Sequence, residues 1–328
     1  MSFDIWPPIS PEDLRIKAAQ VQERELSWIT ERTIVVCQEL RHGLEDCYAL
    51  LAPTDPGSTL VMSTPRNEKV KGTITRVGTR IIKGSLGLQL RMIPPQMLTL
   101  SQSYNIPIHA LDDLHIRLTE SIDLLGLILS GPDDDSMSPR PDAQSLSSAL
   151  RLLADSITSS IALLKGPSLV EPQTSWTTES VPRAHFSPPL SPNFSFYITI
   201  QECSIVVWLR VLEPLDAPVH FGMKLGLAIG TVRRLEHDEM DTIFKYKHSG
   251  DNRSDTMRHP ANHAFEPKSV SAPLSSRDYE DVHVREKVRV ESADPNLISL
   301  HAKLGYLGVM LGQARRNLAA VMGVELEM

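Results

Sequence analysis

The sequence predicts an α+β fold: an elongated antiparallel helical bundle with heptad seams, and a separate antiparallel β-rich domain, each built from discontinuous segments. In four long segments, apolar residues recur at spacings of three and four, which is typical of amphipathic helices. Between these segments, apolar and polar residues alternate, as in half-buried strands. The order is helix, strands, two helices, strands, helix, so we expect the first and last helices to pack with the central pair.

The first predicted helix begins after Ser10, whose hydroxyl can cap it together with Asp13, while Pro11 suits the first helical position. Pro53 ends this helix. The second and third helices end at Gly-Pro pairs. The three seams comprise Leu26, Ile29, Val36, Leu40, Leu44, Cys47 and Leu51 (with Thr33 in one slot); Leu111, Leu114, Leu118, Ile122, Leu125 and Leu129; and Leu146, Leu150, Leu153, Ile157, Ile161 and Leu164.

The last helix, beginning at Asp294-Pro295, has the most regular heptad pattern of the chain. Burial of its seam would contribute a gross stabilisation of about 1.5–3 kcal/mol per side chain. The complementary seams predict that it lies beside the first helix. The structural seam consists of Leu297, Leu300, Leu304, Leu307, Leu311 and Leu318, together with Ala314 and Val321.

The strand patterns and the seams together predict domain boundaries. We expect a helical bundle domain from residues 10–52, 108–165 and 294–323, and a β domain from 57–104 and 193–290. Residues 166–192 and 248–277 are rich in proline, serine and polar residues, and we predict that both are mobile loops. The alternating runs start at Val70, Leu86, Phe194, Ile205 and Val282.

Motifs for catalysis or cofactor binding are not evident in the sequence. There is no GxxxxGK[ST], HExxH or GxSxG motif, and Gly222, Gly226 and Gly230 do not form a GxGxxG loop. His237 stands in a short acidic stretch that favours a solvated turn over a metal site. We therefore expect a protein that is not an enzyme and that has no cofactor and no bound metal.

Charge and hydropathy limit the partners. The formal net charge of -7 argues against nucleic-acid binding. No window approaches the roughly 18 apolar residues of a membrane span, so we expect no direct membrane insertion. The first ten residues do not resemble a signal peptide, and the three cysteines lack CxxC spacing, both of which are typical of a cytoplasmic protein with reduced thiols.

Several short strings, in order, resemble the Rogdi family, whose fungal member is the second subunit of the RAVE complex, the regulator of V-ATPase assembly. Trp28 matches the tryptophan of the family's first helix, and Val70, Lys71 and Gly72 match its Val-Lys-Gly strand. The seams resemble the family's leucine zipper. The strings are Glu25-Leu26-Ser27-Trp28-Ile29, Lys69-Val70-Lys71-Gly72-Thr73-Ile74-Thr75, Leu86-Gly87-Leu88-Gln89-Leu90, and Leu190-Ser191-Pro192-Asn193-Phe194 leading to Leu209-Arg210-Val211-Leu212.

The resemblance implies a non-catalytic binding subunit, or scaffold, that promotes reassembly of the V-ATPase catalytic sector with its membrane sector and so supports vacuolar acidification. It implies a large β-propeller RAVE subunit and a Skp-type adaptor as partners, and peripheral recruitment to vacuolar or endosomal membranes through them. The alternative is a structural coiled-coil or homodimer protein unrelated to proton pumps. Exposed seams would favour that alternative, whereas seams buried within one chain favour the first interpretation.

Overall fold

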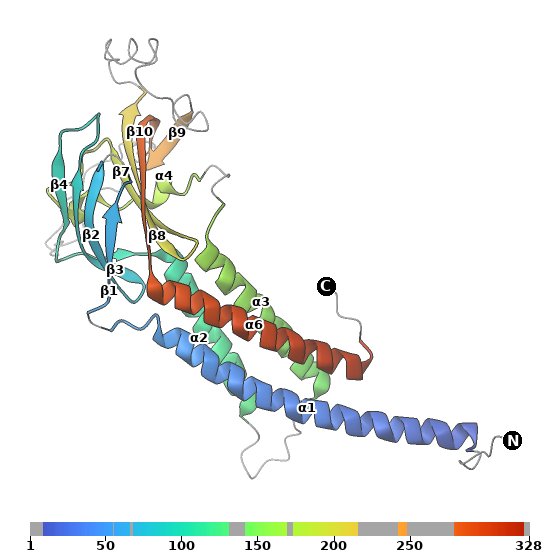
Figure 1. The fold of residues 1–328 in the computed structure, drawn as a ribbon. Helices are drawn as coiled ribbons and strands as arrows, with labels where there is room; N and C mark the ends of the chain where they lie inside the picture. Colours follow the sequence, from blue (N-terminus) through green and yellow to red (C-terminus); the bar gives the residue numbers. More distant parts are fainter. Residues whose placement is uncertain are drawn as a thin grey trace, which may run out of the picture. The chain divides into compact units, whose positions relative to one another are not determined.

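The computed structural model describes residues 9–54, 56–65, 68–130, 142–168, 173–215, 242–247 and 279–324. The chain forms two compact units (Figure 1). Unit 1 comprises Met1–Ala52, Leu111–Leu164 and Asn296–Met328, and unit 2 comprises Pro53–Ala110 and Lys165–Pro295. The long helices belong to unit 1, and two antiparallel sheets belong to unit 2. The predicted α+β class, with discontinuous segments in each part, is confirmed.

Unit 1 contains four long helices: α1 (Pro11–Ala49), α2 (His109–Leu129), α3 (Ala143–Lys165) and α6 (Pro295–Met322). Helices α1 and α6 lie side by side and antiparallel (Figure 1). Near the C-terminal end of α1, Lys303 Nζ donates to Asp46 Oδ2 at 2.7 Å. Toward the other end of the pair, Ile29 of α1 and Asn317 of α6 line the same groove. The predicted pairing of the first and last helices is therefore observed.

The ends of the helices follow local capping rules. At the start of α1, Ser10 Oγ accepts a hydrogen bond from the backbone N–H of Asp13 at 3.1 Å and donates to the Asp13 carboxylate at 2.7 Å. The helix ends at Ala49, four residues before Pro53. Gly166 follows α3 with a φ of +71°, and a Cβ there would lie 2.0 Å from the carbonyl oxygen of Ile200. Only glycine fits that position.

At three positions a neighbouring residue is buried in place of the predicted seam residue. Cys37 takes the place expected for Val36, Ser121 that of Ile122, and Ser160 that of Ile161. Along α2 and α3 the buried residues are spaced alternately three and four apart, and Ser121 and Ser160 continue this alternation. Ile122 and Ile161 would interrupt it. Ser121 Oγ lies 2.8 Å from Ser156 Oγ, so its hydroxyl is hydrogen-bonded between α2 and α3. The half-buried members of the predicted seams are Leu26, Val36, Ile122, Leu129, Ile161 and Val321.

Unit 2 contains two sheets. The first, sheet A, has the order β1-β2-β3-β4-β6, with β5 also paired to β3; the second, sheet B, has the order β7-β8-β10-β9. All of these pairs are antiparallel. The bounds are β1 (Ser58–Ser63), β2 (Val70–Val77), β3 (Arg80–Leu88), β4 (Gln96–Leu100), β5 (Ile106–Pro107), β6 (Phe186–Ser187), β7 (Phe194–Gln201), β8 (Ser204–Pro214), β9 (Ile243–Lys247) and β10 (Tyr279–Ala293).

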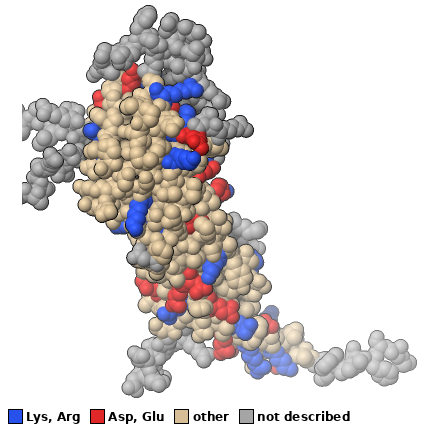
Figure 2. Space-filling view, turned by 60° about the vertical axis from the view of Figure 1, so that its left-hand side comes forward, with Lys and Arg blue, Asp and Glu red and all other residues tan. Residues whose placement is uncertain are grey.

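Sheet A shows the predicted half-burial. Val70 and Ile74 of β2 are buried, whereas Lys71 and Thr73 between them are exposed. On the outer face of the neighbouring strands, Val61 and Met97 are 65% and 58% exposed. Figure 2, in which this side comes forward, shows few charged side chains on this part of unit 2. The alternation that predicted these strands therefore corresponds to one covered and one solvated face.

In sheet B, by contrast, the prediction of half-buried strands for β7 and β8 is wrong, because both of their faces are covered. On one face, the ring of Phe196 lies 4.8 Å from that of Phe186 in sheet A. On the other face, Tyr197 and Leu212 pack with Trp176 in a buried cluster. Polar residues of the alternation are consequently buried as well; Ser195 has no exposed surface, and its hydroxyl lies 2.6 Å from Ser180 Oγ.

A β-bulge divides the apolar pattern of β10. Val284 pairs with Leu212, whereas Glu286, two residues on, pairs with the adjacent Val211. The extra residue changes which face of the sheet the alternate side chains occupy. Val282 and Val284 therefore lie on the opposite face from Val288 and Val290. The alternating run that starts at Val282 predicted one apolar face for the whole strand, which the bulge excludes.

The prediction of a loop over residues 166–192 is wrong for residues 173–192, which contain regular structure. Their described part carries α4 (Trp176–Glu179), a 3₁₀ helix (Arg183–His185) and β6. Trp176, only 1% exposed, belongs to the core cluster of sheet B. The composition was that of a loop, but one large aromatic side chain anchors the segment. The second predicted loop, 248–277, lies outside the described residues, as do Gly222, Gly226, Gly230 and His237.

Candidate functional site

The six leucines of the predicted structural seam all point into unit 1. Leu297, Leu300, Leu304, Leu307, Leu311 and Leu318 are between 0% and 3% exposed. The C-terminal seam of the chain is therefore occupied by the chain's own helices, and it stabilises the bundle by burying apolar surface. A partner would have to bind another surface.

The Val-Lys-Gly string has a structural role at the start of β2. Val70 is fully buried, and Lys71 is exposed and forms a 3.2 Å ion pair with Glu68. Gly72 lies opposite Leu86 in the ladder, and a Cβ at this position would lie 1.9 Å from the carbonyl oxygen of Ser85. The close approach of the two strands thus explains the glycine.

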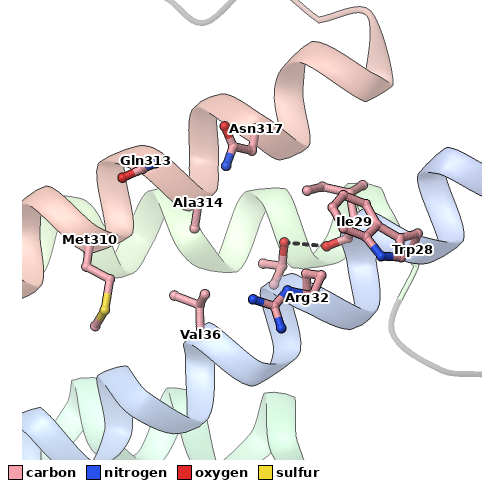
Figure 3. A pocket seen from close by; sticks show the side chains of 9 residues that line it. Trp28, Ile29, Arg32, Val36, Met310, Gln313, Ala314 and Asn317 are labelled. Atoms are coloured by element: carbon pink, nitrogen blue, oxygen red, sulfur yellow. Dashed lines mark hydrogen bonds between the residues drawn. The ribbon is translucent and has the colours of Figure 1, made fainter.

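A groove of about 290 Å³ runs between α1 and α6 (Figure 3). On the α6 side, Met310 and Ala314 face the groove, and on the α1 side Val36 does so. The Thr33 hydroxyl donates to the carbonyl oxygen of Ile29 at 2.7 Å, which satisfies this polar group within the helix. The lining comprises Trp28, Ile29, Arg32, Thr33, Val36, Met310, Gln313, Ala314 and Asn317.

Trp28 and Arg32 give the groove its chemical character. Trp28 is 63% exposed, although it is the largest apolar side chain of α1. Arg32 is the one charged residue of the lining, and it forms no ion pair within the described part of the chain. Tryptophan and arginine are among the residue types that are enriched in protein–protein interfaces.

A second apolar stripe, which sequence reasoning missed, extends from this groove along α1. Leu14, Val21, Trp28 and Val35 are seven residues apart and are 58%, 50%, 63% and 41% exposed. Seven residues are almost two turns, so the four side chains lie along one side of the helix. The spacing could have been read from the sequence, but the stronger intramolecular seam on the same helix concealed it.

The N-terminal part of α1 extends beyond the buried core. Every residue from 11 to 25 is exposed, and burial along α1 begins at Ile29. An isolated helix of this length is only marginally stable in water. Leu14 and Val21 are therefore at least half exposed on a segment of α1 that the core of unit 1 does not support.

Two buried cysteine thiols of α1 have perturbed pKa values. Burial raises the pKa of the Cys37 and Cys47 thiols to about 11, so both are protonated at neutral pH.

A pocket of about 220 Å³ in unit 2 is lined in part by His109, Glu179 and His185, and burial lowers the pKa of His185. Within the described ranges, no group of three or more His, Cys, Asp or Glu residues could hold a metal ion. None of the described helices is long and apolar enough to cross a membrane.

These features define an α+β protein whose most distinctive described surface is an apolar and cationic groove between helices. The sequence profile described as Rogdi leucine zipper containing protein matches residues 25–319. The chain therefore belongs to the Rogdi leucine zipper family. Comparison with curated proteins gives no match. Trp28 lies within the matched region, whereas Leu14 and Val21 precede it.

Proposed function

We propose that this protein is a non-catalytic binding subunit of a complex that promotes assembly of the V-ATPase catalytic sector with its membrane sector. The observation that carries the proposal is the family match, which spans residues 25–319. The resemblance in the short strings around Trp28 and Gly72 points to the RAVE-type members of that family. Such a subunit acts by holding two bodies at a high effective concentration, which needs binding surfaces and no reactive groups.

The geometry of unit 1 supports this role over that of a coiled-coil dimer held by its leucine seams. The seam leucines of α6 are buried against the chain's own helices. A zipper between two chains would have to expose them. The groove with Trp28 and Arg32 is instead available to a different protein.

The proposed partners are a large β-propeller subunit of the complex and a small Skp-type adaptor, with direct or indirect contact to the catalytic sector. We propose that the protein acts in the cytoplasm and reaches vacuolar or endosomal membranes through these partners. Its effect on the pump would then depend on the partners' affinity and not on any bound cofactor.

The proposal is tested in cells that lack this protein. The pump subunits should be present at normal abundance, while the fraction of catalytic sector on membranes falls and the organelle lumen becomes less acidic. The measurements are organelle pH and the distribution of the catalytic sector between membrane and soluble fractions. Normal membrane attachment of the catalytic sector in these cells would refute the proposal.

A further inference from the structure

We draw no further inference here: the strongest candidate, the exposed apolar stripe of α1 that continues into the groove between α1 and α6, carries nothing because nothing in the structure shows what covers it.

Discussion

Arg76 and Asp294 form a fully buried ion pair although 218 residues separate them in sequence. Nε of Arg76 lies 2.6 Å from Oδ2 of Asp294, and their side chains are 2% and 0% exposed. Arg76 also donates from Nη1 to the carbonyl oxygen of Gly78. The pair joins β2 to the residue that follows β10, so it ties the two sheets of unit 2 at one end. The sequence indicated only that the last helix begins at Asp294-Pro295.

Removal of one member of this pair should be strongly destabilising. Asp294→Ala leaves the guanidinium of Arg76 buried without its carboxylate, which typically costs about 3–5 kcal/mol. The measurement is the free energy of unfolding of the full chain in denaturant, followed by a signal from unit 2 such as tryptophan fluorescence. A loss below about 1 kcal/mol would show that the buried charge finds another partner.

A double-mutant cycle separates the ion pair from any effect on the start of α6. The double variant Arg76→Met with Asp294→Leu removes both charges, and it should recover a large part of the stability lost in either single variant. Strict additivity of the two single changes would contradict a direct interaction.

Substitution at the centre of the α6 seam should unfold unit 1. Leu304 is fully buried, and Leu304→Asp places a carboxylate among leucines without a partner. The expected loss is several kcal/mol, comparable to the whole stability of a typical domain. The matched control is Tyr306→Asp on the same helix, because Tyr306 is 68% exposed. Circular dichroism should show helix loss in the first variant only, and wild-type melting of Leu304→Asp would refute the bundle.

Gly72→Ala should destabilise sheet A because the new methyl group has no room. Its Cβ would lie 1.9 Å from the carbonyl oxygen of Ser85, which is backbone and cannot rotate away. We expect a cost of at least about 1–3 kcal/mol from overpacking. Gly84→Ala in the adjacent strand is the control, since the nearest atom there is a side-chain carbon of Ile74 at 3.4 Å. Similar thermal unfolding of both variants would contradict this account.

The Asp46–Lys303 pair between α1 and α6 should be detectable by titration. The hydrogen bond from Lys303 lowers the pKa of the Asp46 carboxyl, and the same bond raises the pKa of Lys303. The carboxyl therefore favours folding above its unfolded pKa, and this contribution is lost as pH falls through the lowered folded pKa. The ammonium favours folding below its unfolded pKa, and its contribution is lost as pH rises through the raised folded pKa.

NMR titration of the Asp46 carboxyl in wild type and in Lys303→Ala measures this directly. The pKa of Asp46 should lie below the ordinary aspartate value in wild type and return toward that value in the variant. An unchanged pKa in the variant would mean that the two side chains do not interact in solution. The pair is exposed, so we expect the lowering to be smaller in high salt.

The sequence by itself determined the type and approximate bounds of the main elements. Helical periods depend on residues three and four apart, so the seam containing Leu304 and Leu311 could be recognised locally. The alternation around Val70 and Ile74 likewise identified half-buried strands of sheet A. The exposed stripe from Leu14 to Trp28 could also be recognised from the sequence. Because α1 carries two apolar stripes, only the burial of the side chains shows which stripe the chain itself covers.

Tertiary structure alone decided the features that depend on pairing between distant residues. The bulge after Val284 follows from the register with β8, and it places Val288 on the other face of the sheet. Trp176 is buried because sheet B offers a surface for it, whereas the composition around it was that of a loop. The contact of Arg76 with Asp294 has no local signature, because two isolated charged residues are ordinarily solvated unless the fold removes both from water.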